Sequence, residues 1–162
     1  MFNAYQYFQQ ICEKNKILVD GEYRFCRVTG LANMEEVIQK WKAAKAWFCI
    51  DDTEDGTLIG SRGAGFFERR SHTVFILKKF PYGNMDLQHA ALQECRTVFR
   101  QIMKKLILDR RVLENEMTYL KLDSVPWHEF PGYVLSGCTG LYFEVVIEIP
   151  IDLCYNGDEW NN

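Results

Sequence analysis

The sequence lacks the features of a membrane-spanning or secreted protein. No apolar run approaches the ~18 residues that a transmembrane helix needs. The N-terminus also has no basic region followed by an apolar one, as a signal peptide would. We therefore expect a soluble protein that is not secreted and that makes no contact with a membrane.

An excess of basic residues is absent as well. The chain has 19 lysines and arginines against 22 aspartates and glutamates, which leaves a net charge of −3. A dedicated nucleic-acid-binding protein usually shows a strong basic excess, so this balance argues against that class. With 48% hydrophobic and 25% charged residues, the 162-residue chain has the composition of one globular domain with a real core.

No pattern typical of catalytic or metal-binding residues stands out. The three histidines fall at no metal-binding spacing, and the six cysteines are scattered without a CxxC pair. Residues 51–56 resemble the first half of a calcium-binding loop, but Arg62 occupies the twelfth position, where a glutamate is needed. We predict free thiols, no metal, no cofactor and no enzymatic activity.

Two catalytic alternatives depend on geometry that the sequence does not fix. Cys138 and His128 could form a nucleophilic pair if the fold brings them within hydrogen-bond distance. Glu144 and Glu148 could act as an acid and a base. The commoner roles for these residues are a small residue entering a strand, for Cys138, and a solvated strand face, for the two glutamates.

Residues 85–111 predict a long helix. Asn84 is a favourable N-cap, and no glycine or proline interrupts the run. Such a helix is ~40 Å long and needs a wide apolar surface beneath it, which a sheet usually provides. Its apolar stripe consists of Leu92, Cys95, Phe99, Ile102, Met103 and Leu106.

Residues 141–152 alternate between apolar and mostly polar side chains, which predicts a long strand with one buried face. A half-solvated strand of this kind indicates a mixed or antiparallel sheet with helices on one face. We therefore predict one α+β domain at residues 1–152, with the sheet packed against the long helix, shorter helices in the N-terminal half, and a C-terminal tail at 153–162.

The remaining elements follow from local signals. An Asp20-Gly21 turn favours a hairpin, and two prolines favour an irregular connection at residues 124–132. We expect helices at 3–15 and 34–45, the second capped by Asn33, a hairpin joining 17–19 to 23–28, and strands at 46–50, 73–80 and 118–122.

Residues Gly60 to Gly65 form a glycine-rich segment. Glycine-rich loops bind phosphate when a helix follows them, but here a strand is expected next, and the spacing matches no nucleotide-binding motif. A hairpin tip or loop that reaches a partner is the better-supported interpretation. A small enzyme or a phosphate- or metabolite-binding protein that uses this loop remains the alternative.

The second half of the chain resembles small virion proteins of tailed bacteriophages. The likeness lies in residues 85–111 and in the passage from Phe130 to Pro150, where Gly137-Cys138-Thr139-Gly140 leads into the alternating strand. Neck, tail-terminator and tail-completion proteins have this order of elements. Residues 151–156 are similar to proteins of crAss-like phages of gut bacteria.

This resemblance implies a subunit of a closed ring in the neck or tail-terminator region, joining portal and tail. Such rings are six-fold in tail terminators or twelve-fold in necks, and DNA passes through them without sequence recognition. The implied partners are other copies of the chain and neighbouring neck, portal or tail proteins. The implied location is the virion, and the host cytoplasm during assembly. The family has no catalytic residues to carry over.

The ends of the chain are rich in aromatic residues, which are enriched at protein interfaces. The N-terminal aromatic residues could instead close the core of their own domain. The arginines in and after the glycine-rich segment could reach a partner. The candidates for contact with neighbouring subunits are Phe2, Tyr5, Tyr7, Arg62, Arg69, Arg70, Tyr155 and Trp160. A cytoplasmic adaptor with a peptide-binding sheet edge is a further possibility.

Overall fold

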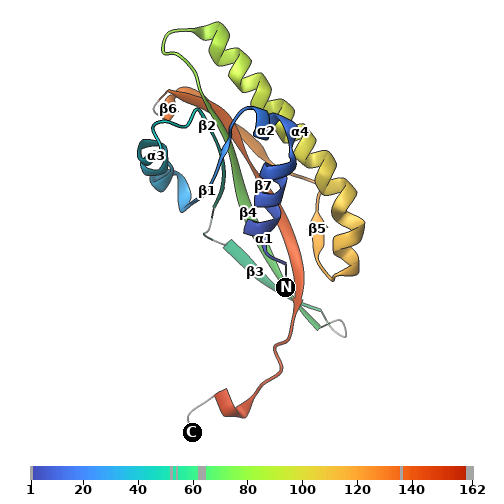
Figure 1. The fold of residues 1–162 in the computed structure, drawn as a ribbon. Helices are drawn as coiled ribbons and strands as arrows, with labels where there is room; N and C mark the ends of the chain where they lie inside the picture. Colours follow the sequence, from blue (N-terminus) through green and yellow to red (C-terminus); the bar gives the residue numbers. More distant parts are fainter. Residues whose placement is uncertain (1, 52, 54, 62–64, 136, 160–162) are drawn as a thin grey trace.

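A mixed sheet runs the length of the molecule and carries helices on both faces (Figure 1). The computed structural model describes residues 2–51, 53, 55–61, 65–135 and 137–159. Its strands are β1 (Arg24–Val28), β2 (Ala46–Asp51), β3 (Asp55–Ser61), β4 (Gly65–Lys79), β5 (Tyr119–Lys121), β6 (Trp127–Leu135) and β7 (Cys138–Ile151). Its helices are α1 (Ala4–Lys14), α2 (Lys16–Asp20), α3 (Gly30–Lys40), α4 (Met85–Asn115) and the short 3-10 helix η1 (Gly157–Glu159). The α+β prediction is confirmed.

Strands β4 and β7 form the centre of the sheet. They pair antiparallel from Phe66 opposite Ile151 to Lys79 opposite Cys138. On the other side of β4, β2 and then β3 pair with successive lengths of the same strand, while β1 joins β2 in parallel. Strands β5 and β6 pair with the remaining side of β7. The sheet is therefore mixed.

The predicted packing of the long helix on the last strand is confirmed. Helix α4 begins at Met85 because the side chain of Asn84 accepts a hydrogen bond of 3.0 Å from the backbone N–H of Leu87. It continues four residues beyond the predicted end, to Asn115. The core that it shares with β7 contains Cys95, Val98, Ile102, Leu106, Leu141, Phe143, Val145 and Ile147.

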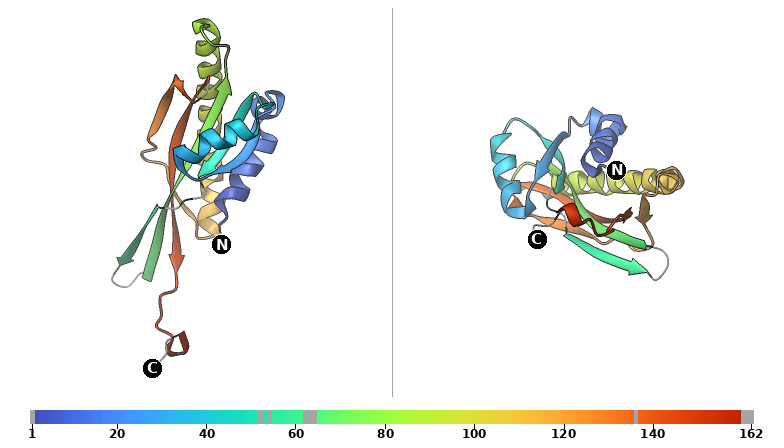
Figure 2. Two further views of the ribbon diagram at one scale, coloured as in Figure 1. Left: turned by 90° about the vertical axis from the view of Figure 1, so that its left-hand side faces the viewer. Right: turned by 90° about the horizontal axis from the view of Figure 1, so that it is seen from below.

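The helices cover the sheet unequally (Figure 2). Helices α1, α2 and α4 belong to the larger apolar cluster on one face, where Phe8 and Leu18 are buried. Helix α3 covers part of the other face through Met34 and Ile38, which pack near Trp47. Among the described helices, none combines the length and the apolar character that crossing a bilayer would require.

The predicted hairpin at residues 17–28 is wrong. Residues 16–20 form α2. The side-chain oxygen of Asn15 accepts a hydrogen bond of 3.2 Å from the N–H of Leu18 at its start, and the N–H of Gly21 donates one of 2.9 Å to the carbonyl of Ile17 at its end. The Asp20-Gly21 pair therefore ends a helical turn. Strand β1 pairs with β2, which comes much later in the chain.

Two other segments differ from their predictions. Helix α3 begins at Gly30 and ends at Lys40, and Asn33 lies inside it, where its side chain accepts a hydrogen bond of 3.3 Å from the N–H of Thr29. The expected irregular connection at 124–132 contains most of β6. A proline is tolerated there because β6 lies at the edge of the sheet and its pairing shifts register after Phe130.

One end of the sheet projects beyond the helices. Strand β3, the first half of β4 and the end of β7 form a three-stranded extension, and the chain after β7 continues away from the body (Figures 1 and 2). We call the three-stranded part the β-extension, and residues 152–159 the C-terminal segment.

Candidate functional site

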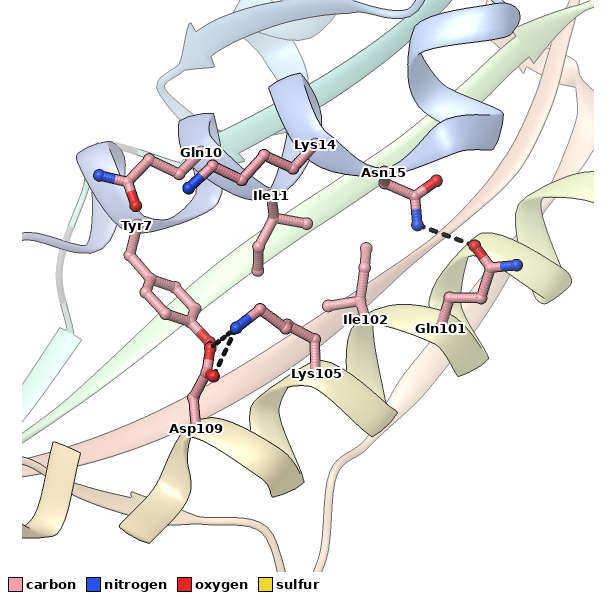
Figure 3. A pocket seen from close by; sticks show the side chains of 9 residues that line it. All are labelled: Tyr7, Gln10, Ile11, Lys14, Asn15, Gln101, Ile102, Lys105 and Asp109. Atoms are coloured by element: carbon pink, nitrogen blue, oxygen red, sulfur yellow. Dashed lines mark hydrogen bonds and ion pairs between the residues drawn. The ribbon is translucent and has the colours of Figure 1, made fainter. Parts of the chain in front are cut away.

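A cleft of about 290 Å³ lies between α1 and α4. Ile11 and Ile102 line its apolar part, and polar side chains from both helices surround them (Figure 3). The amide of Asn15 donates a hydrogen bond of 2.8 Å to Gln101 and so ties the end of α1 to α4. The cleft therefore lies at a junction between two helices of the same domain.

Tyr7 closes one end of this cleft. Its hydroxyl donates a hydrogen bond of 2.8 Å to Asp109, which also accepts from the ammonium of Lys105 at 2.5 Å. Burial, and then the hydrogen bond to Asp109, raise the pKa of Tyr7 well above its ordinary value. The phenol is therefore neutral at physiological pH and holds α1 on α4, so this predicted contact residue has a role within its own domain.

Phe2, Tyr5 and Arg70, three further predicted contact residues, come together around a second cavity of about 280 Å³ between the start of α1 and the sheet. Phe2 and Tyr5 pack against the core. The guanidinium of Arg27 lies 3.8 Å from the centroid of the Tyr5 ring. Arg70 donates a hydrogen bond of 2.8 Å to Glu68. These side chains therefore contribute to packing within the chain.

Arg69 lies on the opposite face of the sheet from Arg70. Its guanidinium binds the carboxylate of Glu148 at 2.5 Å, and the ammonium of Lys121 binds the same carboxylate at 2.6 Å. The Glu148 side chain is only 12% exposed. Burial by itself would raise its pKa, but the hydrogen bonds from Lys121 and Arg69 hold the pKa of Glu148 below its ordinary value. The ion pairs join β4, β5 and β7.

Replacing Glu148 with glutamine is expected to lower the free energy of unfolding by about 1 kcal/mol at neutral pH, as loss of partly exposed ion pairs does. The difference should shrink in acid. A carboxylate whose pKa is lowered on folding stabilises the folded state above its ordinary pKa, here 4.5, and this contribution is lost as the pH falls through the folded-state pKa. Urea unfolding of both proteins at a series of pH values in this range measures the difference in their free energy of unfolding. A difference that does not change with pH would contradict the prediction.

The β-extension exposes large apolar side chains. Leu58 of β3 and Phe66 of β4 are 55% and 44% exposed, and both lie on the sheet face that the helices cover elsewhere. On the other face, Ile59 and Phe67 line a shallow apolar depression next to Tyr119. These residues are not among the predicted contact residues. The sequence does carry a signal for them, because the adjacent pairs Leu58-Ile59 and Phe66-Phe67 place apolar side chains on both faces of two neighbouring strands.

The C-terminal segment continues this exposed surface. Leu153 is exposed, and Tyr155, a predicted contact residue, is 77% exposed. Trp160 and Arg62, two other predicted contact residues, lie outside the described residues. The structure thus leaves Tyr155 exposed, while Tyr5, Tyr7 and Arg70 make contacts within the domain.

The alternative chemical sites have unfavourable surroundings. Burial raises the pKa of the Cys138 thiol to about 11, so a nucleophilic thiolate is disfavoured at neutral pH. The six cysteines form no disulfide in the structure, and five of them are buried or half-buried. The described residues contain no cluster of three or more side chains that could hold a metal ion. Gly60 and Gly65 lie in the paired strands β3 and β4, and the residues between Ser61 and Gly65 are outside the described part of the chain.

The geometry of the β-extension and of the C-terminal segment suits association with another protein. Exposed leucine, phenylalanine and tyrosine side chains gain free energy when a second surface covers them. No protein-family model and no curated protein matches the chain.

Proposed function

We propose that the protein is a structural virion subunit that forms a ring in the neck or tail-terminator region of a tailed bacteriophage and joins portal to tail. One observation carries the proposal: the sheet extends beyond its helices and exposes Leu58 and Phe66 there, and the exposed C-terminal segment continues from the same end. The resemblance of residues 85–111 and 130–150 to neck and tail-terminator proteins supports the same role.

The physical argument concerns the number of contacts. A β-extension that packs against a different surface of the next subunit makes a head-to-tail interface, and such interfaces close into rings when the rotation allows it. A closed ring repeats each contact, so contacts that are individually modest hold the assembly together. A net charge of −3 suits a ring through which DNA passes without binding tightly. The sites of action are the virion and, before that, the host cytoplasm.

Replacing both Leu58 and Phe66 with serine should weaken association between subunits. Fully burying a leucine or phenylalanine contributes ~1.5–3 kcal/mol, so each substitution should lower the association constant of a contact about tenfold. Light scattering on a size-exclusion column, over a series of protein concentrations, measures the change. Val19→Ser is the matched control, because Val19 is equally exposed but lies on α2, outside the β-extension.

We expect the double variant to dissociate at concentrations where the parent and the Val19→Ser control remain assembled. An equal oligomeric mass for all three proteins would remove the β-extension from the interface. Circular dichroism of the double variant should match that of the parent, because both side chains are exposed in the subunit.

A further inference from the structure

The outer face of α4, directed away from the sheet, combines exposed apolar and basic side chains. Its apolar members lie in the second half of the helix, where Leu108 is 71% and Val112 59% exposed. At helical spacing they share this face with three exposed cations. We call the set the α4 outer face; it comprises Arg100, Lys104, Ile107, Leu108, Arg111 and Val112.

The cations of the α4 outer face are available to a partner. Within the described part of the chain, Arg100, Lys104 and Arg111 take part in no ion pair, whereas their neighbours Lys105 and Arg110 pair with acidic residues one turn further along α4. The helical positions between Arg100 and Val112 that face outward carry no acidic residue. This face is therefore both apolar and positively charged.

The C-terminal segment has the complementary chemistry. Leu153 and Tyr155 are exposed, and the segment contains three acidic residues and no basic one. The acidic residues are Asp152, Asp158 and Glu159. Between the end of β7 and the start of η1, residues 152–156 form neither a helix nor a strand.

We propose that the C-terminal segment of one subunit binds the α4 outer face of a second copy. The eight residues 152–159 span at most ~26–29 Å when extended, whereas the stretch of α4 from Arg100 to Val112 is ~18 Å long. The segment is therefore long enough to place Leu153 and Tyr155 on the apolar side chains and its acidic end near the cations. This inference rests on the proposed function, because it requires a second copy.

A second copy suits the geometry better than the segment's own domain. The chain leaves β7 in a direction away from the body, at the end of the molecule where the β-extension projects (Figures 1 and 2). The α4 outer face lies on the far side of the helix from β7. In a ring, the segment would therefore project towards the neighbouring subunit.

Cross-linking tests the contact directly. Cys154 is native and exposed, so the full-length Leu108→Cys variant places a second exposed thiol on the α4 outer face. A short bismaleimide, which links two thiols without oxidation, should give dimers and a ladder of larger species on a denaturing gel. The Leu108→Cys, Cys154→Ser variant should give no ladder above the background of the Cys154→Ser protein, which retains the half-buried Cys26. Asp20→Cys, at an exposed residue of α2, is the matched positional control and should give no ladder above the parent background.

Charge reversal provides the second arm. Lys104→Glu with Arg111→Glu in the cross-linking variant should reduce the ladder about tenfold or more, and added Asp158→Lys with Glu159→Lys should restore it. A cross-link confined to monomers would overturn the proposal in favour of docking within one subunit. An intact ring in which Cys154 forms no ladder with the thiol introduced by Leu108→Cys would overturn the docking surface but keep the proposed function. A protein that is monomeric at every concentration would overturn both.

Discussion

Replacing Gly140 with alanine is expected to lower the free energy of unfolding by more than about 4 kcal/mol, which is exceptionally large for a single substitution. A Cβ atom at this position would lie 1.9 Å from the backbone oxygen of Ile76 and 2.9 Å from the Cα of Leu77. Both neighbours are backbone atoms of β4, so no rotation of a side chain relieves the clash. The two central strands would have to separate.

Urea unfolding followed by circular dichroism measures this loss. Gly157→Ala is the matched control, because a Cβ there approaches nothing closer than 3.9 Å, and it should change the stability by no more than about 0.5 kcal/mol. A Gly140→Ala protein as stable as the parent would contradict the close pairing of β4 with β7.

The second large effect is expected from Phe143→Ala. Phe143 is fully buried between β7 and α4, and its ring lies 5.1 Å from that of Phe99. Truncating a buried phenylalanine removes its transfer free energy and leaves a cavity, which together cost ~3–5 kcal/mol. Thermal and urea unfolding give the value.

Phe99→Ala should cost less than Phe143→Ala. Phe99 is only partly buried and lies at the margin of the core, where its ring also contacts the exposed Trp127 at 5.8 Å. If Phe99→Ala lowered the free energy of unfolding more than Phe143→Ala does, this would contradict the assignment of Phe143 to the centre of the contact between α4 and β7.

The long helix and the last strand were predictable because each carries its own periodicity over many residues. Asn84 and the apolar spacing fix the start and the buried face of α4, and the alternation from Leu141 to Ile147 fixes the face of β7. These patterns depend only on local sequence, and a one-residue slip would bury Glu144. The core assembled from them therefore agrees with the prediction.

Other elements depend on partners that are distant in the chain. The Asp20-Gly21 pair is compatible with a hairpin or with the end of a helix, and the pairing of β1 with β2 decides between them. Strand β4 begins eight residues before the predicted start at Thr73, because this stretch pairs with β3 and β7, and Arg69 contacts Glu148 of β7 there. No local signal contains that contact.

The candidate surface was only partly predictable for the same reason. Aromatic residues near the N-terminus suggested an interface, but Tyr5 and Tyr7 make contacts within the chain. The guanidinium of Arg27 lies over the Tyr5 ring, and the hydroxyl of Tyr7 donates a hydrogen bond to Asp109. Leu58 and Phe66 belong to strands of ordinary composition. They are exposed because the sheet extends beyond the helices that cover it. Local sequence does not encode how far the sheet extends.

The mass of the full-length protein under native conditions tests the proposed ring most directly. Native mass spectrometry over a series of protein concentrations separates a closed assembly from monomers and from open chains of varied length. For a closed ring we expect one dominant species of six or twelve subunits, with few intermediate sizes, because closing a ring satisfies every interface at once. A monomer at all concentrations, or a continuous distribution of open oligomers, would contradict it.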